Sequence, residues 1–141
     1  MTLLSPRTRF PPVSLLSIMA DALLGERVPE RDLPYRVPPG VAVRLNRAVP
    51  RMGGWFMGSR GAATAVTFGR TILWNPDHPI TDDVIVHELV HVEQWKDPLF
   101  AIKYVAGWMR HGYRRNPFEA EAYARQREYA ASRKSIPPRA L

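Results

Sequence analysis

The pentapeptide His87-Glu88-Leu89-Val90-His91 is the part of the sequence best suited to chemistry. Side chains four residues apart lie on one face of an α-helix, so His87 and His91 can direct two imidazoles at one metal ion. Glu88 is rotated to one side of the pair, where its carboxylate can hold a water molecule without binding the metal. The pattern predicts a zinc site with Glu88 as the general base of a hydrolytic reaction.

The flanking sequence predicts a helix at about residues 82–95 around this motif. Thr81 is placed to act as the N-cap, and Asp82 and Asp83 fall in the first turn, where the helix dipole favours negative charge. The residues between Glu88 and the second histidine are uncharged, as a buried metal-binding helix requires. The alternative interpretation is a surface helix whose histidines bind no metal.

A third ligand is needed because a catalytic zinc site has three protein ligands and one open position. The chain has no cysteine, so this ligand is a histidine or a carboxylate. Four downstream residues are candidates: Asp97, His111, Glu119 and Glu121. Asp97 is better explained as a helix cap, and His111 as a residue at a helix C-terminus. Glu119 and Glu121 lie on different faces of a further predicted helix, so at most one can face the metal helix.

Three short strands are predicted from runs of β-branched and aromatic residues at 41–45, 64–68 and 71–74. Gly69-Arg70 connects the last two runs and predicts a hairpin with a type II′ turn. The glycine-rich segment 52–58 carries aromatic residues but no phosphate-binding lysine, so we predict a loop there.

Two more helices are predicted after the metal helix. Asp97-Pro98 and Asn116-Pro117 each place a capping side chain before a proline, and Gly112 is a natural stop between them. Strands followed by helices indicate an α+β domain.

The 141 residues are enough for one domain with a single core. Eight of the 14 prolines lie in the first 50 residues, and residues 26–40 are predicted to form an extended connector. We divide the chain into an N-terminal helix and proline-rich arm at 1–40, which could act as a prosegment, a domain at 41–135 and a frayed tail at 136–141.

The formal net charge of +7 comes mostly from arginines that are dispersed along the chain. Dispersed basic residues usually form a solvated surface, and no nucleic-acid-binding module is recognisable, so a nucleic-acid partner is not expected. No run of about 18 apolar residues exists, so no membrane span is predicted.

The N-terminus resembles a short signal peptide, because Arg7 and Arg9 precede the apolar run 13–19. The pair Pro11-Pro12 and the early charge at Asp21 favour an amphipathic helix that packs on the domain instead. We therefore predict a cytoplasmic protein, with secretion as the alternative.

The metal helix and the segment 116–124 together resemble the gluzincin metallopeptidases, the thermolysin-like clan. In that family a glutamate on a following helix completes the zinc site, and an aspartate four residues later orients a ligand histidine. The resemblance implies Glu119 as the third ligand, with Glu121 as the reserve. Tyr123 stands where the family has the aspartate, so the second-shell anion is lost, although a phenol can still hydrogen-bond.

Residues 63–74, Ala-Thr-Ala-Val-Thr-Phe-Gly-Arg-Thr-Ile-Leu-Trp, look like the hairpin that precedes the metal helix in minigluzincins and compact bacterial HExxH domains. The resemblance covers roughly residues 60–130. It implies a small zincin-like fold in which a β-hairpin is followed by a three-helix core that carries the metal site.

The resemblance further implies zinc-dependent hydrolysis of a peptide or protein substrate. Zinc on His87, His91 and Glu119 would polarise the substrate carbonyl, and a strand edge of the hairpin would hold an extended peptide. A donor to the oxyanion is expected among three residues: Tyr113, His111 and His78.

Two other functions fit the sequence. Compact HExxH domains lack the large lobe that walls the cleft of thermolysin-like enzymes, which favours a zinc-stabilised binding or secretion-associated module without catalysis. The intact Glu88 favours catalysis, because a purely structural site does not need it. The remaining alternative is an arginine-rich nucleic-acid binder in which the motif is incidental.

Overall fold

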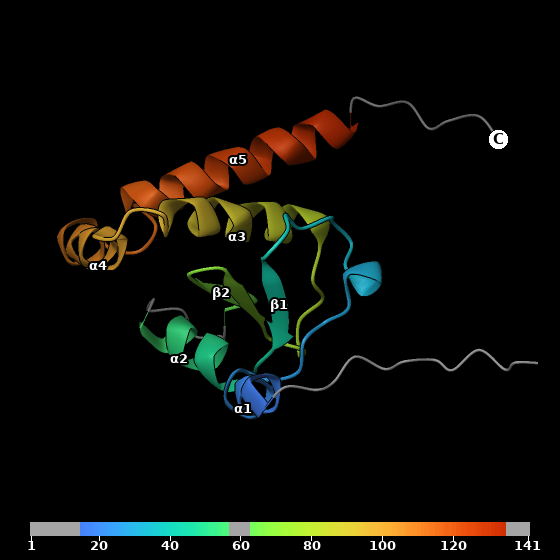
Figure 1. Ribbon diagram of the computed structural model, residues 1–141. Helices are drawn as coiled ribbons and strands as arrows, with labels where there is room; N and C mark the ends of the chain where they lie inside the picture. Colours follow the sequence, from blue (N-terminus) through green and yellow to red (C-terminus); the bar gives the residue numbers. More distant parts are fainter. Residues whose placement is uncertain (1–14, 57–62, 135–141) are drawn as a thin grey trace, which may run out of the picture.

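A computed structural model describes residues 15–56 and 63–134 of the chain. It contains α1 (Leu15–Leu24), the short 3-10 helix η1 (Glu30–Asp32), β1 (Ala42–Leu45), α2 (Ala48–Phe56), β2 (Ala65–Phe68), β3 (Thr71–Trp74), α3 (Asp82–Gln94), α4 (Phe100–His111) and α5 (Pro117–Lys134). The α+β class is confirmed. Helix α3 lies between α5 and the sheet, and α1 and α2 lie on the other side of the sheet (Figure 1).

The three strands form one mixed sheet in the order β1-β3-β2. Strands β2 and β3 are the predicted antiparallel hairpin, and Phe68 pairs with Thr71 across the two-residue loop. Gly69 has a φ of 57°, and among the described residues no non-glycine residue has a positive φ, so that of Arg70 is negative. This is the pattern of a type II′ turn. Strand β1 pairs in parallel with β3, so β2 is left as an edge strand that packs against α3.

The core is built between the sheet and α3, from apolar side chains such as Val43, Ile72 and Ile85. Val28 and Val37 are buried in the same core. The extended connector predicted for residues 26–40 is therefore wrong in part, since η1 interrupts it and its valines help to hold the domain together.

The loop predicted at residues 52–58 is also wrong, because α2 continues to Phe56; residues 57 and 58 lie outside the described part of the chain. Asn46 begins this helix, since its Oδ1 accepts a hydrogen bond from Val49 N at 3.0 Å. Pro50 stands in the first turn, where it costs no backbone hydrogen bond. The adjacent pair Gly53-Gly54 lowers helix propensity, but these start signals outweigh it.

Helices α3 and α5 lie where the sequence predicts them. Thr81 occupies the N-cap position of α3, although its side chain makes no capping hydrogen bond there. Asn116 caps α5, because its Oδ1 accepts from Phe118 N at 3.3 Å. The predicted frayed tail lies outside the described residues. Most of the stretch that resembles a signal peptide lies outside them too, and α1 covers only the end of that stretch.

Helix α4 begins at Phe100 rather than at Asp97-Pro98. Asp97 Oδ1 accepts from Leu99 N at 2.9 Å, so Asp97 stabilises the turn before the helix rather than its first residue. The helix ends at Gly112, whose φ of 74° fits the predicted stop. No described helix has both the length and the apolar character needed to cross a bilayer.

Candidate metal centre

Three buried side chains converge between α3 and α5. His87 and His91 come from α3 and Glu119 from α5, and their ligand atoms all lie within 4.8 Å of one another. The two Nε2 atoms are 3.3 Å apart. Each also lies 3.4 Å from an oxygen of Glu119, His87 from Oε2 and His91 from Oε1. The structure therefore brings together the three residues that the sequence and the family resemblance selected.

These separations fit a tetrahedral metal ion. A zinc–nitrogen distance of about 2.1 Å places two nitrogens of a tetrahedral site about 3.4 Å apart. The observed distance between the two imidazole nitrogens is 3.3 Å, and the carboxylate lies equally close to both. A donor set of two imidazoles and one carboxylate suits zinc and other first-row divalent ions.

Charge in this cluster is strongly coupled. Burial by itself would lower the pKa of His91, but the hydrogen bond to Glu119 and the nearby carboxylates outweigh it and raise the pKa to about 9. Burial would raise the pKa of Glu119, but the contacts with the imidazoles of His87 and His91 and the hydrogen bond from Tyr104 hold it well below its usual range. The buried carboxylate of Glu119 therefore favours a positive charge beside it, either a proton on His91 or a metal ion.

Gln94 fixes the orientation of His91. His91 Nδ1 donates to Gln94 Oε1 at 2.8 Å, so in the neutral imidazole Nε2 carries no hydrogen and is free to bind a metal. The Gln94 amide is itself held, since its Nε2 donates to Phe118 O at 3.1 Å and to Glu121 Oε2 at 2.9 Å. Gln94 was not predicted from the sequence, although its place three residues after a ligand histidine was a usable signal.

Tyr104 on α4 orients the carboxylate. Its hydroxyl donates to Glu119 Oε1 at 2.5 Å, and burial together with the negative charge of Glu119 raises the pKa of Tyr104. Glu119 Oε2 has no hydrogen-bond partner and is directed at the imidazole of His87. One oxygen is thus occupied by protein, while the other faces the centre of the cluster.

Tyr123 does not replace the family's aspartate in the expected way. Its ring packs edge-on against the imidazole of His87, with ring centroids 4.6 Å apart. Its hydroxyl lies 3.4 Å from that of Tyr113, and His87 Nδ1 has no hydrogen-bond partner among the described residues. Tyr123 therefore fixes His87 by packing, and the hydrogen bond that the sequence allowed is not made.

Glu88 is buried beside the cluster without joining it. Thr67 on β2 donates from Oγ1 to Glu88 Oε2 at 2.6 Å, and this contact holds the carboxylate toward the sheet. Trp95 Nε1 in turn donates to Thr67 O at 3.1 Å. Thr67 was missed by sequence analysis, although strand alternation places it on the same face as the buried Ala65.

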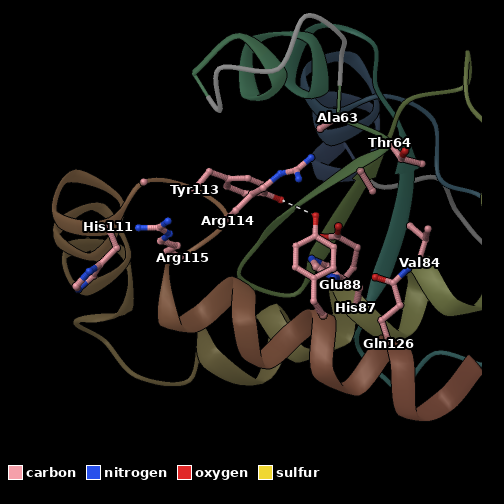
Figure 2. A pocket seen from close by; sticks show the side chains of 13 residues that line it. Ala63, Thr64, Val84, His87, Glu88, His111, Tyr113, Arg114, Arg115 and Gln126 are labelled. Carbon is pink, nitrogen blue, oxygen red and sulfur yellow. Dashed lines mark hydrogen bonds between the residues drawn. The ribbon is translucent and has the colours of Figure 1, made fainter. Parts of the chain in front are cut away.

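Two cavities meet at Glu88. The larger, of about 710 Å³, extends toward the start of α3 and is lined by Val84, His111, Arg114 and Arg115 among others (Figure 2). The smaller, of about 270 Å³, extends toward the end of α3 and is lined mainly by apolar and aromatic side chains. Both are lined by His87, Glu88, Ala65 and Tyr113. An elongated ligand could therefore pass the cluster along α3 and β2.

The remaining candidate ligands lie apart from the cluster. Asp97 is paired with Lys103, and His111 is exposed at the end of α4, where it lines the larger cavity. Glu121 is exposed and contacts only Gln94 near the end of α3, so of the two glutamates Glu119 alone joins the cluster. His78 lines neither cavity, whereas Tyr113 lines both.

Comparisons with protein-family models, with curated proteins and with solved structures find no significant match to this chain. Only the geometry of the metal centre and its cavities therefore bears on the function of the chain.

Proposed function

We propose that the chain is a zinc metallopeptidase with a small zincin-like fold of the gluzincin type. The observation that carries the proposal is the position of Glu88. It is buried beside the three candidate ligands, belongs to none of their mutual contacts, and lies where both cavities meet. A site that only stabilises the fold has no use for an oriented carboxylate in that place.

His87, His91 and Glu119 would hold the zinc ion, which when bound would polarise a substrate carbonyl and make water more acidic. Glu88 would accept the proton of the attacking water and pass it to the leaving amine. Thr67 would keep the carboxylate of Glu88 aimed at that water. Tyr113 is the candidate that we favour as donor to the oxyanion, because it lines both cavities.

The edge strand β2 supports a peptide as substrate. Residues 63–65 line the larger cavity and residues 65–68 the smaller one, so the strand runs beside both. A peptide backbone in extended conformation can add to such an edge. None of residues 21–54, whose side chains the structure describes, lines either cavity.

The alternative function is a zinc-stabilised binding module without catalysis. It shares the metal site, and the small size of the domain favours it. The two proposals differ in the role of Glu88, which only the enzyme requires.

The decisive experiment compares zinc content and hydrolysis of a peptide library in the wild type and in Glu88→Gln. We expect about one zinc per chain in both, and a loss of rate of about 10²–10⁴ in the variant because glutamine cannot accept the proton. A wild type that cannot take up zinc would refute both functions. A zinc-loaded wild type without hydrolysis would favour the binding module.

A further inference from the structure

Helix α4 turns an apolar face toward solvent. Five large side chains on it or next to it are exposed: Leu99 (53%), Ile102 (69%), Val105 (51%), Trp108 (36%) and Met109 (76%). Phe100 and Tyr104 face the protein instead, where they contact Phe118 of α5. A surface helix ordinarily exposes polar residues opposite its buried face. The exposed apolar face of α4, which we define by these five residues, therefore needs a partner.

The charged residues of α4 and of the loop that follows it are all basic. Between Asp97 and Glu119 the sequence contains no acidic residue and five basic ones: Lys103, Arg110, His111, Arg114 and Arg115. Lys103 and Arg110 are seven residues apart, so they lie on one margin of the helix. Lys103 is paired with Asp97, whereas no ion pair within the described residues involves Arg110, Arg114 or Arg115.

We propose that α4 binds an anionic lipid surface, lying in the plane of the interface. Apolar side chains with a tryptophan on one face and basic residues beside them are the combination that places a helix at the boundary of headgroups and acyl chains. Figure 1 shows α4 at one end of the molecule, where a flat surface can reach it. A second copy of the chain fits less well, because a symmetric contact would bring the same basic residues together.

Helix α4 also borders the smaller cavity. Ala101 and Val105 are exposed and also line the smaller cavity beside the metal centre. A bound surface would therefore lie next to that cavity. The proposal goes beyond the proposed peptidase function and does not depend on it, because vesicle binding requires neither zinc nor hydrolysis.

The test is flotation of the full chain with two kinds of vesicle. One is pure phosphatidylcholine, and in the other about a third of the lipid is anionic phosphatidylglycerol. We expect binding to the anionic vesicles only, and weaker binding as salt rises. Met109→Asp should reduce the binding about tenfold or more, and Arg110→Glu should reduce it by about one order of magnitude.

Leu23→Asp is the matched control, because Leu23 on α1 is exposed to 75% and lies far from α4 (Figure 1). It should bind like the wild type, and circular dichroism should show that all variants fold. Because the chain has no cysteine, Met109→Cys also accepts a single polarity-sensitive fluorophore, whose emission should shift to the blue with anionic vesicles.

Equal binding to both kinds of vesicle, or binding to neither, would overturn the proposal. So would equal losses in Met109→Asp and Leu23→Asp. A dimer in light scattering that dissociates in Met109→Asp, without vesicle binding by the wild type, would assign the face to a second copy of the chain instead.

Discussion

Tyr104 and Glu119 are joined by a hydrogen bond of 2.5 Å that links α4 to the candidate metal ligand on α5. The hydroxyl occupies Oε1 of the carboxylate, so Oε2 remains free to bind an ion. Groups that orient a metal ligand contribute to affinity although they do not touch the metal.

Tyr104→Phe should therefore lower zinc affinity by about 10–100-fold while the protein stays folded. The measurement is competition with a chromophoric chelator. Tyr129→Phe is a suitable control, because Tyr129 also donates to a carboxylate, Asp82 Oδ2 at 3.1 Å, but lies outside the cluster. Equal affinities in Tyr104→Phe and in the wild type would show that the contact does not orient the ligand.

The choice between the two glutamates gives a second prediction. Glu119→Ala should weaken zinc binding by orders of magnitude, because it removes a buried ligand, whereas Glu121→Ala removes an exposed contact to Gln94 and should leave binding nearly unchanged. Isothermal titration of both variants with zinc provides the comparison. The reverse ranking would transfer the third ligand to Glu121.

Thr67→Val should reduce kcat for peptide hydrolysis by about tenfold to a hundredfold, with KM and zinc content unchanged. The methyl group cannot donate to Glu88, so the carboxylate loses the contact that aims it. Thr71→Val on the neighbouring strand serves as the control for β-sheet stability. A rise in KM at constant kcat would mean that Thr67 acts on substrate binding instead.

Zinc binding should release a proton at neutral pH. In the metal-free chain the pKa of His91 is raised to about 9, so its proton must leave before Nε2 can bind metal. Because one proton leaves His91, apparent affinity should rise about tenfold per pH unit up to about pH 9 and level off above it. Calorimetry in two buffers of different ionisation enthalpy measures the proton; equal heats in both would contradict this prediction.

The raised pKa of His91 also determines how the stability of the metal-free protein changes with pH. Because the folded-state pKa of His91 lies above its usual 6.5, its contribution to stability is fully present below pH 6.5 and is lost as the pH rises through about 9. Added zinc should offset this loss, since it binds the folded chain.

Much of the fold was predictable because its signals are local. The hairpin depends on Gly69-Arg70, and the start of α5 depends on Asn116-Pro117. The helix α2 was missed because Gly53-Gly54 argues against a helix, although Asn46 and Pro50 mark its beginning. The parallel pairing of β1 with β3 depends on the packing of the whole chain, which no local pattern records.

The candidate site likewise contains residues that local sequence predicts and residues that it does not. His87, Glu88 and His91 are set by helical spacing within five residues, and Glu119 followed from the family resemblance. Thr67 and Tyr104 reach the site from β2 and α4, so their roles depend on tertiary contacts. Sequence spacing alone cannot supply such contacts between separate elements.

Asn116 joins α4 to α5. Its side chain is fully buried and caps α5, and its Nδ2 donates a hydrogen bond to Tyr104 O of α4 at 3.1 Å. Helix α4 also packs closely against this side chain at Gly107, because a Cβ there would lie only 2.7 Å from Asn116 Oδ1. Asn116 therefore ties α4 to the first turn of α5, where Glu119 lies. If α4 shifts when its exposed apolar face binds a lipid surface, zinc binding and lipid binding become reciprocally linked. Each then changes the affinity of the other by the same factor.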